Sequence, residues 1–474
     1  MLYKMLLSAA LVLCAANLSK AIWISGYYAG WTQYTMAPEN IDFEAITHLI
    51  HFSFMPGAAG ALNDDFGLSD SHIKATVAAG HNAGKKVILC IGGAGSGQGF
   101  LDATTTANRQ IFISNIINKL TNYGYDGIDI DWEPVTSPDS GQFIPFIQEL
   151  RAALDTAGPG LLLTAACGDD YFDPEQRNLW VRIQDQMDQM NLMTYVMSAP
   201  WPGWITWHGS ALYNGGQGFP SFPARPLPCA DEWVNNWLEA GILPERLGIG
   251  IEFSGDIWGG GTGTSTGGVS EPYQSWITEP TFSGDVDYTI LMNNYYNASR
   301  YHYDTLAEAP YLSINEPGSA NDNFITYTDA PAISAKINYI ASKKIGGCII
   351  WQLAHDYFGP GNSPLKVAVK QALATLNIEK EETEVPARPS PAFTVFPNPV
   401  TSSAINLRLQ PHQGACFLII TNILGRIVYE KTLIGNNITL GFELLKQGMS
   451  ESGIYYFSVS DGKTRMVNRV IRLN

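Results

Sequence analysis

The stretch Asp126-Gly-Ile-Asp-Ile-Asp-Trp-Glu133 alternates acidic and apolar residues. Side chains two apart in a β-strand share a face, so Asp129, Asp131 and Glu133 point one way and the apolar residues between them point the other. The apolar side chains are suited to pack against helices, and the acidic side chains then point to the opposite side of the strand. The run therefore predicts a strand inside the protein with three carboxylates stacked on one side.

Seven other apolar runs of similar length are expected to be strands, which makes eight in all. They are Trp23–Tyr28, Ile46–Phe54, Lys86–Ile91, Leu161–Ala166, Met190–Tyr195, Leu247–Phe253 and Gly347–Gln352, beside Gly127–Trp132. Helical stretches such as Thr105–Tyr123 and Gly141–Ala157 lie between them. This alternation is typical of a parallel sheet covered by helices. Eight units over about 350 residues predict an α/β fold of the TIM (β/α)8 type, with an open doubly wound sheet as the alternative.

Three further segments depart from the barrel pattern. The seventh and eighth strands are too far apart for one loop and one helix, so residues 257–324 are expected to form a small packed insertion. Its glycine-rich start, Trp258–Gly268, favours a rim loop over a phosphate cradle because no Gly-Lys-Ser/Thr follows. The charged, proline-rich residues 379–391 predict a linker between a barrel domain at 22–378 and a C-terminal domain at 392–474. That domain is expected to be an antiparallel β-sandwich with strands at Phe417–Thr421, Ile427–Lys431, Tyr455–Val459 and Val467–Arg472.

Composition and the N-terminus limit where the protein works and what it binds. The formal net charge of −16 argues against a nucleic-acid partner, which would favour a basic surface. The apolar run from Met5 to Ala16, followed by Ser19 and Ala21, predicts a signal peptide at 1–21. That run is too short to span a bilayer, and no other segment is predicted to span one. Without a Cys-x-x-Cys pair, the cysteines are expected to be buried thiols, and neither a metal nor a cofactor is expected.

The three carboxylates themselves point to chemistry. The run ends at Glu133-Pro134, which places Glu133 at the carboxyl-end mouth of the barrel, where the active sites of such folds lie. Like charges this close raise the pKa of at least one carboxyl and keep it protonated near neutral pH. A purely structural role is disfavoured, since no basic partner lies nearby in the sequence. A magnesium or calcium site is the other alternative, but no neighbouring strand end supplies matching ligands.

These residues carry a resemblance. The run Asp126-x-x-Asp129-x-Asp131-x-Glu133 resembles the signature of glycoside hydrolase family 18, the chitinases. The other strand motifs that resemble this family are Gly26-Tyr27-Tyr28, His51-Phe-Ser-Phe54, Ile91-Gly92-Gly93, Met193-Thr-Tyr195 and the segment from Gly346-Gly347 to Trp351. Pro310-Tyr-Leu and Phe324-Ile-Thr-Tyr327 resemble the edges of the α+β insertion of deep-cleft members. The resemblance covers residues 22 to about 375.

The resemblance implies a retaining, substrate-assisted mechanism. Glu133 would act as general acid and base, and the acetamido oxygen of the substrate would attack the anomeric carbon. Family 18 is one of the exceptions to the scheme of two catalytic carboxylates. Asp131 would hold the acetamido nitrogen, Asp129 would share a proton with Asp131, and Tyr195 would position the acetamido oxygen.

The resemblance also implies a substrate and the residues that bind it. Trp351 would form the apolar floor under the cleaved sugar, Trp201 would line the cleft, and Tyr27, Phe52 and Met193 would complete it. The expected substrates are chitin and chitin oligosaccharides, cleaved at β-1,4 links. One alternative is an endo-β-N-acetylglucosaminidase acting on N-glycans, whose usual barrel lacks the insertion. The other is a non-catalytic chitin-binding barrel, although such proteins typically lose the acid.

Some positions depart from the family pattern, and the tail carries a second resemblance. Val196 stands where Asp is usual, Cys90 where Ser is usual, and Ala94 where many processive members have Trp. In the tail, Phe396-Pro-Asn-Pro399, Leu424-Gly-Arg426 and Gly453-Ile-Tyr455 resemble the C-terminal sorting domain of type nine secretion cargo. This implies recognition by the secretion machinery and passage through the periplasm to the cell surface or medium. A carbohydrate-binding module is the alternative for this domain.

Overall fold

A computed structural model describes most of the barrel region and the strands of the tail. The described residues are 22–168, 175–316, 321–376, 393–396, 405–409, 416–422, 427–433, 437–440, 452–460 and 465–472. The chain divides into two compact units, Met1–Glu384 and Val385–Asn474. The predicted signal peptide at 1–21 and the predicted linker at 379–391 lie outside the described residues.

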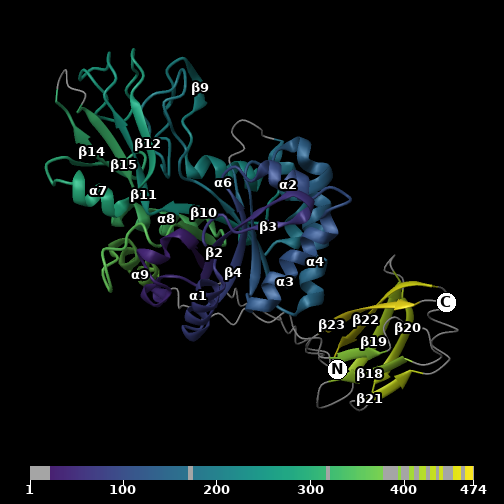
Figure 1. The fold of residues 1–474 in the computed structure, drawn as a ribbon. Helices are drawn as coiled ribbons and strands as arrows, with labels where there is room; N and C mark the ends of the chain where they lie inside the picture. Colours follow the sequence, from purple (N-terminus) through teal and green to yellow (C-terminus); the bar gives the residue numbers. More distant parts are fainter. Residues whose placement is uncertain are drawn as a thin grey trace, which may run out of the picture. The chain divides into compact units, whose positions relative to one another are not determined.

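Eight parallel strands form a closed barrel (Figure 1). They are β1 (Trp23–Ala29), β2 (His48–Pro56), β4 (Lys86–Gly93), β5 (Gly127–Trp132), β6 (Leu162–Cys167), β7 (Gln189–Leu192), β10 (Leu247–Glu252) and β16 (Gly347–Trp351). The strands neighbour one another in the order β1-β16-β10-β7-β6-β5-β4-β2, and the parallel pairing of β1 with β2 closes the ring. The predicted TIM barrel is confirmed, and the open doubly wound sheet is wrong.

Helices cover the outside of the barrel strands (Figure 1). They are α1 (Asp70–Asn82), α2 (Gly97–Ala103), α3 (Arg109–Tyr123), α4 (Ser140–Ala157), α5 (Gln176–Ile183), α6 (Ala230–Glu239), α8 (Ala330–Lys343) and α9 (Pro364–Thr375). Short 3-10 helices lie at Gly30–Tyr34, Pro38–Asn40, Phe43–Ala45, Ala58–Gly60, Ser137–Asp139, Gln184–Gln186 and Pro244–Arg246. Local sequence sets the helix ends: the Asp329 side chain accepts a hydrogen bond from Ala332 N–H at the start of α8. Gly124, at φ +75°, ends α3.

Strand β5 packs as its alternation predicts. Ile128, Ile130 and Trp132 are buried in the main hydrophobic core. The Trp132 ring stacks on Phe100 of α2, with centroids 4.6 Å apart. Asp126 precedes the strand and lies at the opposite end from Glu133, where its carboxylate accepts hydrogen bonds from Lys86 Nζ at 2.9 Å and Val87 N–H at 2.8 Å. Asp126 therefore joins β5 to β4 and takes no part in the site at the carboxyl ends of the strands.

The sixth barrel strand is shorter than Met190–Tyr195, the range predicted for it. β7 ends at Leu192, and Val196 has a φ of +53°. This left-handed backbone is incompatible with an extended strand and is an outlier for a β-branched residue. The chain already turns before Val196, since Thr194 N–H donates to Leu192 O at 2.9 Å and Tyr195 N–H donates to Met193 O at 2.8 Å. Tyr195 therefore lies beyond the strand.

A second sheet is inserted between β10 and β16. Its strands are β11 (Ser254–Gly259), β12 (Thr281–Asp287), β13 (Tyr301–Asp304), β14 (Ala309–Ile314) and β15 (Asn323–Tyr327), and they pair antiparallel in the order β12-β11-β15-β14-β13. Helix α7 (Tyr288–Asn294) follows β12. Leu291, Leu312 and Ile325 belong to an apolar cluster of their own. Short strands β3 (Leu62–Asn63), β8 (Gly218–Phe219) and β9 (Phe222–Pro226) lie elsewhere in this unit.

The C-terminal unit contains two antiparallel sheets, as predicted. One has the order β17-β18-β21 and the other β20-β19-β22-β23. The strands are β17 (Phe393–Phe396), β18 (Ile405–Leu409), β19 (Cys416–Asn422), β20 (Ile427–Leu433), β21 (Asn437–Leu440), β22 (Gly453–Ser460) and β23 (Arg465–Arg472). Leu407 and Leu440 of the first sheet share one hydrophobic cluster with Leu418 and Phe457 of the second. Such a shared core is how two sheets pack as a sandwich.

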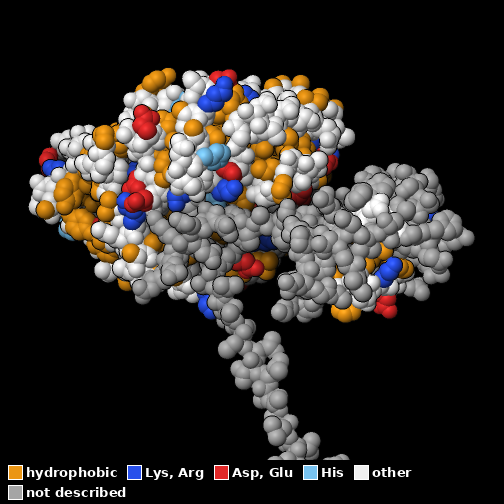
Figure 2. All heavy atoms as spheres, turned by 90° about the horizontal axis from the view of Figure 1, so that it is seen from below, with side chains coloured by type: hydrophobic (Ala, Val, Ile, Leu, Met, Phe, Trp, Pro, Cys, Tyr) orange, Lys and Arg blue, Asp and Glu red, His pale blue; other side chains and the backbone are white. Residues whose placement is uncertain are grey.

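The surface charges, the helix lengths and the cysteines also bear on the predictions from the sequence. On the coloured part of the face in Figure 2, acidic and basic side chains lie in small separate groups. None of the helices in the described ranges is long and apolar enough to cross a membrane. The free cysteines found in those ranges, all of them buried, are Cys90, Cys167, Cys229, Cys348 and Cys416.

Candidate active site

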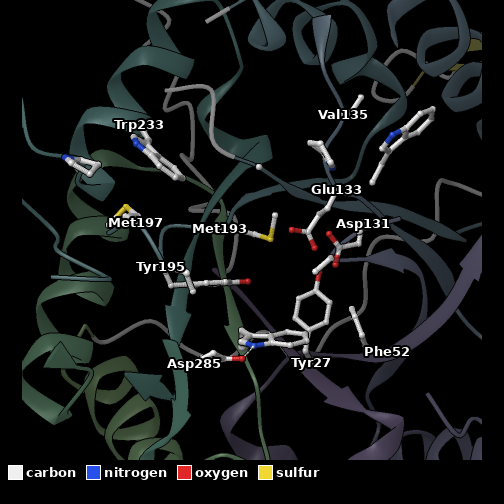
Figure 3. A pocket seen from close by; sticks show the side chains of 18 of the residues that line it. Tyr27, Phe52, Asp131, Glu133, Val135, Met193, Tyr195, Met197, Trp233 and Asp285 are labelled. Atoms are coloured by element: carbon white, nitrogen blue, oxygen red, sulfur yellow. Dashed lines mark hydrogen bonds between the residues drawn. The ribbon is translucent and has the colours of Figure 1, made fainter. Parts of the chain in front are cut away.

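A cavity of about 740 Å³ opens at the carboxyl ends of the barrel strands. It brings together most of the residues singled out from the sequence (Figure 3). The predicted residues that line it are Tyr27, Phe52, Asp131, Glu133, Met193, Tyr195, Trp201 and Trp351. Asp129 is absent from the lining and lies one layer deeper, where its side chain is 0% exposed.

Asp129 is held by two hydroxyl groups. Tyr27 Oη donates to its Oδ2 at 2.8 Å, and Thr164 Oγ1 donates to its Oδ1 at 2.6 Å. Thr164 lies on β6, which pairs directly with β5, whereas Tyr27 lies on β1, three strands away around the ring, and reaches Asp129 across the barrel interior. Burial raises the pKa of Asp129, and the two hydrogen bonds oppose that rise. The deepest carboxyl is therefore oriented by neutral donors.

A hydrogen bond joins the carboxyl groups of Asp131 and Glu133, which requires one of the two to be protonated. Burial first, and then the charges of Glu133 and Asp129, raise the pKa of Asp131 well above its ordinary value. Burial also raises the pKa of Glu133, while the hydrogen bond from Asp131 lowers it. The sequence predicted repulsion between like charges as the cause, and burial is the larger one. Asp131 Oδ1 is buried and has no hydrogen-bond partner among the described residues, so an acceptor is left for a ligand.

The loop after β4 fixes the backbone of Glu133. Glu133 N–H donates to Ser96 Oγ at 3.0 Å, and Ser96 Oγ donates to Asp131 O at 3.0 Å. Gly97 N–H donates to Glu133 O at 2.9 Å. A Cβ atom at Gly92, whose φ is +112°, would lie 2.0 Å from Asp131 O, so this position requires glycine. The Gly92-Gly93 motif thus lets β4 approach the acidic strand closely.

Aromatic rings form the floor of the cavity. The Trp351 centroid lies 5.6 Å from Tyr27 and 5.0 Å from Phe52, both in edge-to-face geometry. Trp351 Nε1 donates to Asp285 Oδ2 at 3.0 Å. Tyr195 reaches toward the carboxyls from the side opposite β5 (Figure 3). Burial and then the nearby charges raise the pKa of Tyr195 well above its ordinary value, so its hydroxyl stays protonated and can donate.

Several lining residues were missed by the sequence reasoning. They are Trp31, Phe66, Gln176, Trp204, Trp233 and Asp285. Trp31 follows the Gly-Tyr-Tyr motif by three residues, which is a signal that could have found it. Asp285 belongs to the inserted sheet and carries no motif. No Lys or Arg is found among the described residues that line the cavity, whereas three carboxyl groups, those of Asp131, Glu133 and Asp285, belong to its lining.

Residues 24–356 match the family described as "Glycosyl hydrolases family 18". The chain belongs to this family. The family predicted from the strand motifs is therefore confirmed, and with it the assignment of the chain to the glycoside hydrolases. Residues 394–472 match the "Secretion system C-terminal sorting domain", which confirms the resemblance predicted for the tail.

Relatives of family 18 extend over most of this chain. Chitinase A1 of Niallia circulans is 29% identical over 408 residues, covering 80% of this chain and 54% of that protein. Chitinase B of Serratia marcescens is 26% identical over 373 residues, covering 66% of this chain and 73% of that protein. The chain thus spans only about half the length of the first relative. A solved family 18 N-acetylglucosaminidase from Paenibacillus barengoltzii aligns with TM-score 0.61 at 24% identity, covering 74% of this chain and 100% of that one, and supports the fold.

The three departures from the family 18 pattern all lie at the site. Cys90 is buried and hydrogen-bonded to Asp129, and burial raises the pKa of its thiol well above the ordinary value, so it is a neutral neighbour. Val196 lines the cavity with 44% of its surface exposed and contributes no acceptor there. Ala94 lines the cavity and leaves open space where many family members have an aromatic ring.

Proposed function

We propose that the chain is a secreted chitinase that hydrolyses β-1,4 linkages between N-acetylglucosamine units with retention of configuration. The observation that carries the proposal is the hydrogen-bonded Asp131–Glu133 pair, which lies in a cavity with an aromatic floor. A carboxyl whose pKa is raised by burial stays protonated at a pH where a free carboxyl does not, and this is what a general acid requires.

Glu133 donates its proton to the glycosidic oxygen, because it is the outermost carboxyl of the stack and lines the cavity. The acetamido oxygen of the substrate attacks the anomeric carbon as the bond to the leaving sugar breaks. Glu133, now ionised, takes a proton from the water that opens the intermediate, and the configuration is retained. Family 18 enzymes need no second carboxylate as nucleophile for this sequence.

Asp131 assists the nucleophile. Its unpartnered Oδ1 accepts the acetamido N–H, and a negative charge on Asp131 stabilises the positive charge that develops on this nitrogen. The proton it shares with Glu133 can move toward Asp129, whose carboxyl is held ready by Tyr27 and Thr164. Tyr195 donates a hydrogen bond to the acetamido oxygen and holds it near the anomeric carbon.

The sugar ring lies on Trp351, whose apolar face is supported from the side by Tyr27 and Phe52. Met193 and Trp201 line other parts of the cavity. The names of the relatives, two chitinases, favour polymers or oligomers of N-acetylglucosamine. The antiparallel insertion supports the same substrate over the N-glycan substrate of endo-β-N-acetylglucosaminidases.

Two terminal segments support export. The apolar N-terminus predicts a signal peptide at 1–21, and residues 394–472 match a secretion sorting domain. We infer passage into the periplasm and then recognition of the C-terminal unit by type nine secretion machinery. The enzyme would then act at the cell surface or in the medium, where chitin is met.

Glu133→Gln tests the proposal. Glutamine keeps the shape of the side chain but cannot supply a proton, so turnover of a soluble chitin oligomer should fall by at least about 100-fold while the oligomer still binds. Glu149→Gln, which alters an ion pair with Arg109 between helices outside the cavity, is the matched control and should keep full activity. Near-normal turnover in Glu133→Gln would remove this residue from the role. An unmodified protein that binds the oligomer and releases no product would favour the non-catalytic barrel.

A further inference from the structure

A β-bulge in the inserted sheet directs one carboxylate into the cavity. In the pairing of β11 with β12, Gly255 lies opposite Val286 and Ile257 opposite Ser283. Asp256 alone therefore faces two residues, Gly284 and Asp285, which defines a bulge and re-aims the side chain that follows it. Asp285 has a φ of +54°, in the left-handed region that a residue other than glycine occupies at a cost.

Three hydrogen bonds hold Asp285 in this conformation. Its N–H donates to Asp256 Oδ1 at 3.2 Å, across the bulge. Ser254 Oγ donates to Asp285 Oδ1 at 2.7 Å, and Trp351 Nε1 donates to Asp285 Oδ2 at 3.0 Å. The inserted sheet thus orients the indole ring that forms the floor of the barrel cavity, and Figure 3 shows Asp285 among the side chains that line this cavity.

The carboxylate still has acceptor capacity that faces the cavity. An ionised carboxylate can accept about four hydrogen bonds, and the two side-chain donors use one on each oxygen. Asp285 lines the cavity and its side chain is 39% exposed. His355 Nδ1 lies 3.8 Å from Asp285 Oδ1, beyond hydrogen-bond distance.

The position of this acceptor relative to Trp351 suggests what it binds. A sugar that lies on an aromatic face presents hydroxyl and amide N–H groups at its edge. Val196 lines the same cavity and offers no acceptor. A carboxylate hydrogen-bonded to the edge of the indole is placed to receive a donor from the rim of the sugar.

We propose that Asp285 is a substrate-binding residue that determines specificity: it orients Trp351 and accepts a hydrogen bond from a hydroxyl or amide N–H of the sugar on that ring. This inference rests on the proposed chitinase function and deepens it. It assigns to the insertion a direct part in recognition, because Asp285 accepts the hydrogen bond from the edge of Trp351.

Two replacements separate the carboxylate from the backbone that carries it. Glycine and asparagine both tolerate positive φ, so Asp285→Gly removes the acceptor and Asp285→Asn keeps an acceptor oxygen without the charge. In a Glu133→Gln background, the dissociation constant of a soluble chitin oligomer should rise about 10- to 100-fold for Asp285→Gly, and less for Asp285→Asn. With Glu133 intact, KM should rise by a similar factor while kcat falls less.

Asp287→Asn is the matched control, since Asp287 lies two residues away, is 41% exposed and is absent from the cavity lining. It should leave the dissociation constant unchanged. Asp285→Gly with unaltered affinity, or an equal loss in Asp287→Asn, would overturn the inference. If Asp285→Gly fails to fold, Asp285→Asn decides it: binding as tight as in the parent overturns the inference, and weakened binding with an unchanged melting temperature supports it. A wild-type protein that neither binds nor cleaves the oligomer instead refutes the proposed function itself.

Discussion

Replacing Asp131 with asparagine should stabilise the barrel while it damages the site. Asp131 is 3% exposed and lies between two other carboxyls on one strand face. Residues two apart on a strand are about 7 Å apart, and two charges at that distance interact by about 2.4 kcal/mol at an effective dielectric of about 20. The Asp131→Asn variant has no charge at this position and avoids that repulsion. For a unit of about 350 residues, 2.4 kcal/mol corresponds to a rise in melting temperature of about 3 °C.

The effect has a defined pH dependence. Burial and like charge raise the folded-state pKa of Asp131 well above its ordinary value of about 3.9, so the folded state binds a proton that the unfolded state has released. The contribution of Asp131 to the stability of the wild-type protein must therefore become less favourable as the pH rises above about 4. Calorimetric scans should show a small difference between Asp131→Asn and the wild type at pH about 4, and the full gain at pH about 8.

Asp126 supplies a control with the opposite sign. Burial raises its pKa, but hydrogen bonds from Val87 N–H, Lys86 and His81 outweigh this and lower it below the ordinary value. Its stabilising contribution is present above pH about 4 and is lost as the pH falls. Asp126→Asn should therefore destabilise the barrel most at neutral pH. Equal stability differences at both pH values for Asp131→Asn, or a variant less stable than the wild type at pH about 8, would refute the assignment of a raised pKa to Asp131.

Three other outcomes are expected. Tyr27→Phe removes a hydrogen-bond donor from the buried Asp129 carboxyl, and turnover of a chitin oligomer should fall about 10-fold or more, with little change in melting temperature. Val196→Asp adds a negative charge to the cavity and should move the alkaline limb of the kcat/KM profile upward, by less than about one pH unit because the position is 44% exposed; an unmoved limb would show that this position does not act on Glu133. A chain that ends at Glu379 should keep full activity on soluble oligomers but stay in the periplasm of the native host; normal export would contradict the role given to the tail, and a selective loss on insoluble chitin would favour a carbohydrate-binding module.

Strand positions and the barrel could be predicted because both depend on local patterns. The strand Gly127–Trp132 has the predicted bounds, and the alternation that defined it also placed Trp132 in the core. The same pattern explains why Asp126 is not part of the site. It lies three residues before Asp129, an odd number, and at the other end of the strand from Glu133. Tyr195 was expected within a strand, but the strand ends at Leu192, and Tyr195 N–H donates to Met193 O in a turn.

Features that depend on long-range register had no local signal. Asp285 lines the cavity because β11 and β12, more than 20 residues apart in the sequence, pair with a bulge. Between the paired positions on either side of the bulge, β12 has one residue more than β11. The main cause of the raised carboxyl pKa values could be identified only from the structure. How deeply Asp131 and Glu133 are buried depends on the closed barrel that all eight strands form together. The sequence identified the charges, and only the fold shows that burial contributes most to their pKa shifts.

The bulge in β12 has a consequence for how such a cleft changes over generations. It consists of one extra residue, so the loss of a single codon at Gly284 would restore regular pairing with β11 and turn the following side chain to the other face of the sheet. None of the eight barrel strands would need to change. Insertion or deletion of a single codon in this sheet could therefore change which sugars the cleft accepts. The catalytic residues on β5 would stay unchanged, both in natural evolution and in directed mutagenesis.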